Sequence, residues 1–107
     1  MNVLEAQAIV SNTKQSEHTV YLAKRKELIE RYTLIAEEFI KDASARGSSN
    51  TGLCHTYEDP FDRKVNGLYG EALEVVAMRL RDKGFSARYY DNRSISTMGI
   101  TIDWRVP

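Results

Sequence analysis

Apolar residues recur at helical spacing along residues 17–46, a stretch that contains neither glycine nor proline. Five of them follow one another at steps of four, three, four and four residues: Leu28, Tyr32, Ile35, Phe39 and Ala43. This spacing places the five side chains on one face of a helix. Ser16 has the residue type of an N-cap, and Gly47 follows the last turn as a C′ residue. The pattern predicts a long helix over residues 17–46.

The segment before this helix, residues 2–14, also has a helical composition. The polar run SNTK either separates the two segments or is bridged, so that they form two helices or one. A helix over 17–46 is about 45 Å long, whereas a compact domain of this size has a radius of gyration of about 13 Å. We therefore expect part of the helix to overhang the core. Its apolar face would then meet a second copy or a partner through Leu28, Tyr32, Ile35 and Phe39.

A second helical pattern follows a stretch rich in glycine and serine. Six apolar residues fall at steps of four, three, four, four and four: Phe61, Val65, Leu68, Ala72, Val76 and Leu80. Gly84 comes directly after the basic end of this segment, as expected for a helix C-terminus.

The sequence HTYEDPFDRK at the start of this pattern has two interpretations. In the first, Asp59 is an N-cap, Pro60 takes the first helical position and Asp62 meets the positive end of the helix dipole. In the second, three carboxylates and His55 hold a divalent metal for hydrolysis. A second cluster of ligands is missing from the sequence. We therefore predict a helix start, with no catalytic residue, no metal site and no cofactor.

The remaining patterns predict strands. Residues 85–90 alternate, with Phe85, Ala87 and Tyr89 on one side, and residues 100–106 alternate more strictly. The polar segment 91–99 between them predicts the long loop of a hairpin. Residues 53–57 predict a further short strand after a loop at 47–52.

The predicted order of elements is therefore α-β-α-β-β. It indicates an α+β fold in which a long N-terminal helix and a second helix pack on one face of a small, mostly antiparallel sheet. At 107 residues the chain is expected to form a single domain. This domain divides into a helical arm, about residues 2–46, and an α/β core, about residues 47–107.

Composition restricts the function. Fifteen basic and fifteen acidic residues give a formal net charge of zero, which argues against a basic nucleic-acid coat. Cys54 is the single cysteine, and it is expected to be at least partly buried. As strand neighbours, Cys54 and His55 point to opposite faces and cannot form a catalytic pair. The N-terminal residues lack the pattern of a signal peptide, and no apolar run has the length of a membrane span, so we expect a cytoplasmic protein.

Arginines gather on and beside the predicted hairpin. Arg88, Tyr90, Arg93 and Arg105 are the candidate partner-binding residues. Arginine beside an exposed aromatic side chain can contact phosphate and stack on a base. The alternative is a solvated sheet face, which the interleaved Asp91 and Asp103 favour.

The run LEVVAMRLRDKGFSARYYDNRSISTMGITIDW resembles the C-terminal half of small accessory proteins encoded by tailed bacteriophages. The match lies in Leu80–Phe85, where an amphipathic helix ends in Leu-x-x-x-Gly-aromatic, and in Ile100–Trp104, a strand that finishes in I-x-I-x-W. It covers about the last 35 residues and brings no catalytic residues with it. The resemblance implies a small protein that binds and blocks a host enzyme or defence factor in the host cytoplasm.

Taken together, these patterns predict a non-enzymatic binding protein, dimeric, that inhibits or redirects a host protein. The alternative is a nucleic-acid-binding protein that uses the arginine and tyrosine face of the hairpin.

Overall fold

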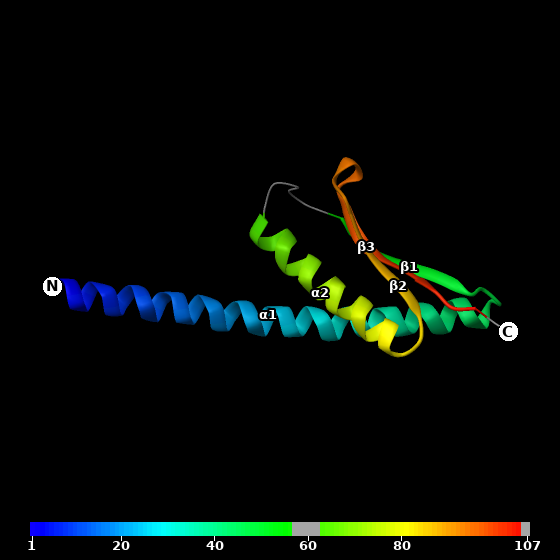
Figure 1. Ribbon diagram of the computed structural model, residues 1–107, viewed down its shortest axis with the longest axis horizontal. Coiled ribbons are helices and arrows are strands. Elements are labelled where there is room, and N and C mark those ends of the chain that lie inside the picture. Colours follow the sequence, from blue (N-terminus) through cyan, green and yellow to red (C-terminus); the bar gives the residue numbers. More distant parts are fainter. Residues whose placement is uncertain (57–62, 106–107) are drawn as a thin grey trace.

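The computed structural model describes residues 1–56 and 63–105, and within the second range the side chains from Asn66 onward. Its elements are α1 (Val3–Ala45), β1 (Asn50–Thr56), α2 (Arg63–Asp82), β2 (Ser86–Asn92), the short 3-10 helix η1 (Arg93–Ile95) and β3 (Thr97–Asp103). Figure 1 shows the two helices and the three-stranded sheet. The predicted order of helices and strands and the α+β class are confirmed.

The N-terminal helix is continuous, so the SNTK run is bridged. Asn2 caps it, its side chain accepting a hydrogen bond from the backbone N–H of Glu5 at 2.9 Å. Within the polar run, the Thr13 hydroxyl donates to the carbonyl of Ile9 at 2.9 Å, and this bond satisfies the side chain without interrupting the helix. The prediction that Ser16 is an N-cap is wrong, because Ser16 lies in the middle of α1.

Both helices end at the predicted glycines. Gly47 and Gly84 have φ angles of 79° and 97°, a left-handed conformation that side chains disfavour. Past each glycine the backbone N–H reaches back into the last turn, from Ser48 to Ala43 and from Phe85 to Leu80. These are the contacts of a Schellman motif, and they turn the chain from helix into strand.

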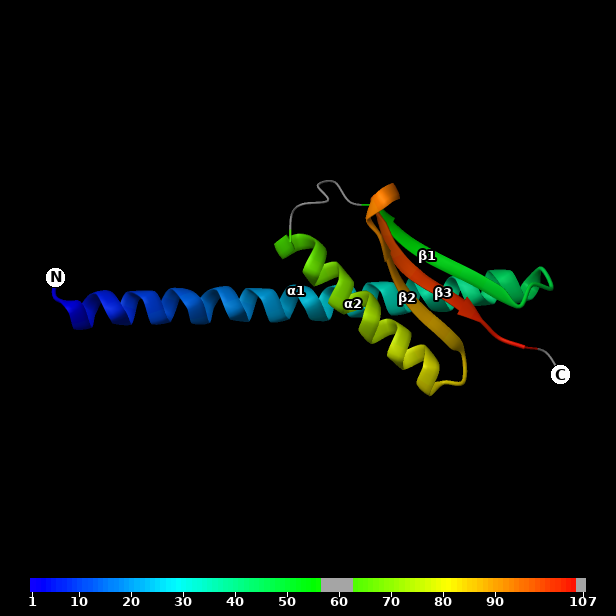
Figure 2. The ribbon, with the colours of Figure 1, turned by 45° about the horizontal axis from the view of Figure 1, so that its top comes forward.

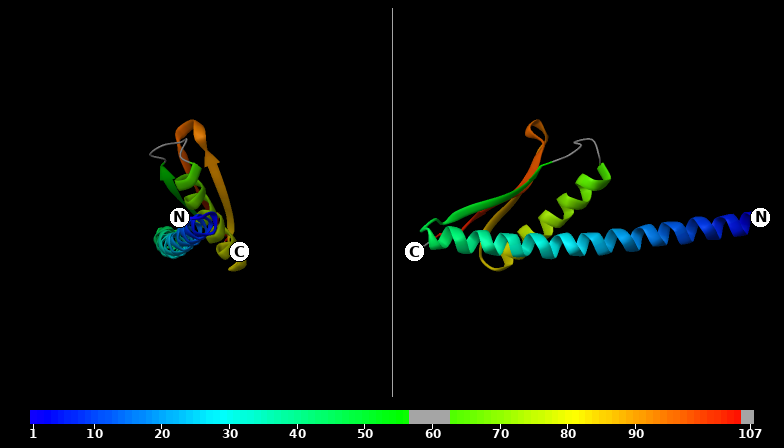
Figure 3. Two further views of the ribbon diagram at one scale, coloured as in Figure 1. Left: turned by 90° about the vertical axis from the view of Figure 1, so that its left-hand side faces the viewer. Right: turned by 180° about the vertical axis from the view of Figure 1, so that it is seen from behind.

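The molecule is elongated because α1 is longer than the body that it supports. Its extents are 69 × 30 × 16 Å and its radius of gyration is 18.3 Å, against about 13 Å for a compact chain of this length. Figures 1 and 3 show the N-terminal part of α1 leaving the body alone. We call residues 3–20 the free arm, and every one of them is exposed. Among the described residues, no helix combines the length and apolarity needed to span a membrane.

The sheet has the order β1-β3-β2, with β3 antiparallel to both neighbours. Figure 2 shows the three strands side by side. Leu53 pairs with Ile100, which pairs in turn with Tyr89, so these residues point to the same face. Helix α1 packs against β1 on this face, and α2 packs against β2 and β3. Both helices therefore cover one face of the sheet, as predicted.

The strands extend beyond their predicted limits. β1 begins at Asn50, inside the predicted loop 47–52, and Tyr57 of the predicted strand lies outside the described residues. The predicted long loop at 91–99 is also wrong, because β2 continues to Asn92 and β3 begins at Thr97. Only η1 and Ser96 lie between these strands, and Ser96 is left-handed. At the end of this extension the side chains of Asn92 and Thr97 point to the face away from the helices.

The core lies between the helices and the covered face of the sheet. Its largest fully buried side chains are Leu28, Leu73, Val76, Leu80, Met98, Ile100 and Ile102. Within the predicted stripe of α2, Ala72, Val76 and Leu80 are buried and Leu68 packs against the core. The predicted positions of Phe61 and Val65 in that stripe lie outside the described side chains.

The predicted partner face of α1 requires correction. Leu28 is fully buried and Tyr32 is 8% exposed, and Ile35 packs against the same core. Helix α2 and strand β1 cover this face within the chain, so Leu28 and Tyr32 are not available to a partner and Ile35 is only partly exposed. Phe39, at 39% exposure, is the most accessible member of the predicted set.

Candidate partner-binding face of the sheet

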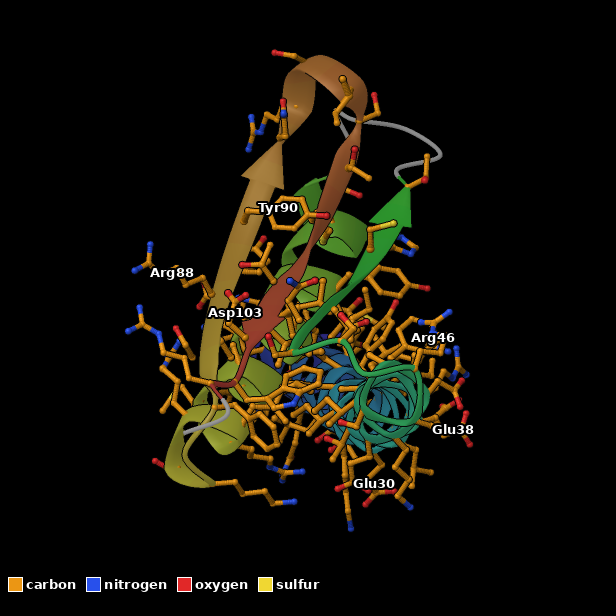
Figure 4. The ribbon with its side chains drawn as sticks, turned by 90° about the vertical axis from the view of Figure 1, so that its right-hand side faces the viewer. Glu30, Glu38, Arg46, Arg88, Tyr90 and Asp103 are labelled. Atoms are coloured by element: carbon orange, nitrogen blue, oxygen red, sulfur yellow. The ribbon has the colours of Figure 1, made fainter. Side chains whose placement is uncertain are left out.

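The second face of the sheet carries no covering layer among the described residues. Figure 4 shows this face toward the viewer, with the helices behind and beside it. The strand register places twelve residues on this face, which we call the open face: Asn50, Gly52, Cys54, Thr56, Ser86, Arg88, Tyr90, Asn92, Thr97, Gly99, Thr101 and Asp103. An antiparallel sheet with one solvated face typically alternates in this way.

Tyr90 is the largest side chain of the open face. It pairs with Gly99 of β3, which pairs with Cys54 of β1. A Cβ atom at Gly99 would lie 2.7 Å from the Tyr90 hydroxyl, so the ring lies directly over this glycine. Figure 4 shows the ring crossing from β2 toward β3. Burial, and to a smaller degree Cys54, raise the pKa of Tyr90, so the hydroxyl stays protonated at neutral pH.

A shallow depression of about 830 Å³ lies beside Tyr90, at the end of the sheet where β2 begins. Its lining residues come from β2, β3 and the adjoining loops: Ser49, Gly84, Ser86, Arg88, Thr101, Asp103, Trp104 and Arg105. The two guanidinium groups and the Asp103 carboxylate supply charges of both signs. Hydroxyl groups and half-buried Trp104 complete the surface. Such a lining can accept a polar segment that carries both donors and acceptors.

Trp104 holds one wall of this depression in place. Its backbone N–H donates to the Ser49 carbonyl at 2.9 Å, which ties the end of β3 to the loop before β1. Its ring meets Phe85 edge-on, with centroids 5.9 Å apart and planes at 84°. Arg105 follows directly and is exposed.

The structure brings together only part of the predicted site. Arg88 and Arg105 both line the depression. Tyr90 lies two residues after Arg88 on β2 and so points to the same face of the sheet. Arg93 is separate, because η1 lies at the opposite end of β2. Its side chain is 73% exposed and lies 4.0 Å from the carboxylate of Asp91. Figure 4 shows Arg88 projecting outward beyond the β2 edge.

Sequence reasoning missed Ser49, Ser86, Thr101 and Trp104 as members of this surface. The alternation of ITIDWRV could have identified Thr101, because residues two apart on a strand point to the same face and Thr101 lies two residues before Asp103. Ser49 and Trp104 gave none, since their meeting depends on the pairing of β1 with β3.

Cys54 and His55 point to opposite faces, as predicted. His55 lies on the helix side and stacks on Tyr69 of α2, with ring centroids 4.0 Å apart and planes at 18°. The expectation of a buried thiol is wrong, because Cys54 is exposed on the open face. Its partner across the sheet is Gly99, which has no side chain to cover it. A thiol–imidazole pair between these two residues is therefore excluded.

The described residues contain no cluster of three or more histidine, cysteine or acidic side chains able to hold a metal ion. The carboxylates of Glu58, Asp59 and Asp62 lie outside the described residues, together with the predicted N-cap. Neither interpretation of HTYEDPFDRK is therefore tested.

Comparison of the chain with protein-family models, curated proteins and solved structures found no match. The geometry of the open face is thus the basis for any functional proposal.

Proposed function

We propose that the protein is a non-enzymatic binding protein and that a partner protein docks on its open face. The observation that carries this proposal is a sheet face that the described residues leave open, on which Tyr90 lies over Gly99 beside a depression lined by Arg88 and Arg105. Tyrosine, tryptophan and arginine contribute most to protein interfaces, and all three occur here. The bacteriophage resemblance supports a narrower form, in which the partner is a host protein that becomes blocked.

A nucleic-acid ligand is the second candidate, and the juxtaposition of Tyr90 and Arg88 favours it. A single-stranded nucleic acid needs a track of cations along its backbone together with stacking side chains. Asp103 lies on the same surface as Arg88 and Arg105, and Arg93 is at the far end of β2. The formal net charge of the chain is zero. A mixed-charge surface suits a protein partner better than a phosphate backbone.

The first experiment compares capture of host proteins by variants of the open face. Immobilised wild-type protein, Tyr90→Ala and the double variant Arg88→Glu/Arg105→Glu are exposed to the same host lysate, and bound proteins are quantified by mass spectrometry. Arg79→Glu is the matched control, because exposed Arg79 belongs to α2, which packs on the other face. We expect at least one protein to bind wild type and Arg79→Glu and to lose most of its binding to both open-face variants.

Alkylation of Cys54 provides a direct footprint of the same face. The thiol is exposed among the open-face residues, so a bound partner should slow its reaction with iodoacetamide several-fold. Partners that bind all variants equally and leave this rate unchanged would contradict the proposal.

The nucleic-acid alternative is tested by fluorescence anisotropy with single-stranded RNA and DNA oligonucleotides at about 50 and about 200 mM salt. Binding that falls steeply with salt and is lost in Arg88→Ala/Arg105→Ala would favour this alternative. We expect no such binding.

A further inference from the structure

The free arm packs against no other part of the chain that the structure describes. All residues from 3 to 20 are exposed, including Val3, Leu4, Ile9 and Val10 at 52–75% exposure. An isolated helix of about this length is marginally stable in water, because nucleation is costly and no packing stabilises it. Packing of its exposed apolar residues against a second surface would stabilise such a helix.

One face of the arm has the spacing of a coiled coil. Six uncharged residues follow one another at steps of three, four, three, four and three: Ala6, Ile9, Thr13, Ser16, Val20 and Ala23. We call these six residues the arm stripe, and they take alternate a and d positions of a heptad. All six are exposed, with Ile9 at 52% and Val20 at 67%. The Thr13 hydroxyl already donates to the Ile9 carbonyl, so its burial would leave no unpaired donor.

The arm stripe points away from the body of the molecule. The side chains of Tyr21 and Arg25 bind Glu71 of α2 and thereby mark the side of α1 that faces the body. At 100° per residue, the stripe lies on average about 120–130° around the helix from these two residues. A second helix can therefore lie along the stripe without displacing α2.

The stripe is also self-complementary. Read in either direction it has equivalent residues at equivalent positions: Ala6 corresponds to Ala23, Ile9 to Val20, and Thr13 to Ser16. A two-fold axis perpendicular to the helix would place each residue opposite its counterpart in a second copy, giving small–small, aliphatic–aliphatic and hydroxyl–hydroxyl layers. This is the property that an isologous interface demands.

The flanking charges fit the same arrangement. Glu5 and Lys26 both take g positions beside the stripe, near its two ends. In an antiparallel pair the g positions of the two helices face each other, so Glu5 meets Lys26 of the second copy. The symmetry repeats this opposite-charge pair at the other end. Antiparallel helices also place opposite ends of their dipoles together.

We propose that two copies of the chain pair through the arm stripe as an antiparallel two-helix coiled coil. The overlap covers about residues 3–26, a length of roughly 36 Å, and places the two bodies at opposite ends of the dimer. The open face takes no part in this contact, so the proposal stands independently of the proposed function.

The first test is the molar mass in solution, measured by sedimentation equilibrium on the full chain. We expect wild type to have twice the 12.2 kDa mass of the chain. Ile9→Glu and Val20→Glu should be monomeric, since each places two carboxylates in the interface. Leu4→Glu is the matched control, because Leu4 is exposed on the same arm but takes position f, opposite the stripe. A wild type that stays monomeric up to its solubility limit, or stripe variants that stay dimeric, would overturn the proposal.

Disulfide cross-linking then determines the direction of pairing. In a Cys54→Ser background, chains carrying Ile9→Cys are mixed with chains carrying Val20→Cys and oxidised. A disulfide requires Cα atoms within about 7 Å. The antiparallel arrangement predicts cross-links between the two variants and none within either variant alone, whereas a parallel coiled coil predicts the reverse. Cross-linking of each variant with itself would therefore contradict the inference.

A charge exchange tests the proposed ion pair. Glu5→Lys alone and Lys26→Glu alone should each raise the dimer dissociation constant several-fold, because like charges then meet at both ends. The double variant restores opposite charges and should recover the wild-type constant. Additive weakening in the double variant would rule out this register.

Discussion

At the scale of single residues, Gly99 permits the close approach on which the open face depends. A Cβ atom here would collide with the backbone carbonyl of Leu53 and would also lie 2.7 Å from the Tyr90 hydroxyl. The Tyr90 side chain can move aside, but the Leu53 carbonyl belongs to the neighbouring strand. The glycine is thus required by strand spacing as well as by the tyrosine.

We expect Gly99→Ala to lower the free energy of unfolding by about 1–3 kcal/mol, the usual cost of forced overpacking. Urea denaturation at fixed protein concentration measures the change. Adding Tyr90→Ala should not restore stability, because the collision with Leu53 remains. Gly67→Ala is the control: among the described atoms outside its own stretch of helix, none lies within 4 Å of an added Cβ, and replacing a helical glycine by alanine should stabilise α2 by up to about 1 kcal/mol.

Tyr32 should make the stability depend on alkaline pH. Burial, with a smaller contribution from Tyr69, raises the pKa of Tyr32 above its ordinary value of 10.0. Above pH 10 the unfolded chain therefore loses this proton more readily than the folded chain does. The contribution of the Tyr32 hydroxyl to the free energy of unfolding is therefore complete below pH 10, and it is lost as the pH rises through the raised pKa of the folded state.

We expect Tyr32→Phe to reduce the loss of stability between about pH 9 and about pH 11. Some loss should remain, because burial also raises the pKa values of Tyr89 and Tyr90. Urea denaturation across this range measures both slopes. Equal slopes for wild type and variant would show that Tyr32 ionises alike in the folded and unfolded states.

At the scale of elements, apolar packing rather than ion pairing holds α1 and α2 together. Arg25 of α1 pairs with Glu71 of α2 at 3.2 Å, and Glu37 of α1 pairs at 3.1 Å with Lys83, the residue directly after α2. These side chains are at least one-third exposed, so solvent screens their attraction. Leu73, in contrast, is fully buried in the core between the helices and the sheet.

Substitutions at these two kinds of contact should therefore differ several-fold in effect. Leu73→Ala is expected to lower the free energy of unfolding by about 2–5 kcal/mol, because it leaves a cavity. Lys83→Ala is expected to cost less than about 1 kcal/mol. Denaturation in low and high salt checks the comparison, and the difference should persist at high salt. A larger loss in Lys83→Ala would show that the ion pair dominates.

At the scale of the whole molecule, stability is expected to differ along α1. Residues 28–45 supply the buried side chains of this helix, whereas the free arm supplies none. Hydrogen exchange separates regions by their local opening free energies. The arm should therefore be protected only to the extent that a second copy covers it.

We expect slow amide exchange over residues 6–20 in wild type and fast exchange there in Ile9→Glu. Amides of residues 28–45 should remain protected in both proteins. Exchange followed by mass spectrometry resolves the two segments on the full chain. Unchanged arm protection in Ile9→Glu would show that the arm is stable without pairing through its stripe.

Local patterns in the sequence determined the main elements of this protein. The steps of three and four predicted a helix over 17–46 and a second one ending at Gly84, and alternation predicted the final hairpin. Helical periodicity, strand alternation and glycine caps depend on neighbours in the chain, so the sequence displays them directly. The element order and the α+β class follow from them.

Tertiary structure decided which of these surfaces face solvent. The sequence predicted Leu28 and Tyr32 as part of a partner-binding face, but α2 and β1 bury them. Cys54 is exposed because the register between β1 and β3 places it on the open face. Arg105 joined Arg88, while Arg93 was placed at the other end of β2. Such outcomes depend on contacts between segments far apart in the chain, and a one-residue change of register would reverse each strand's faces. The sequence therefore determined the elements of this protein, and packing between them determined its open face and its free arm.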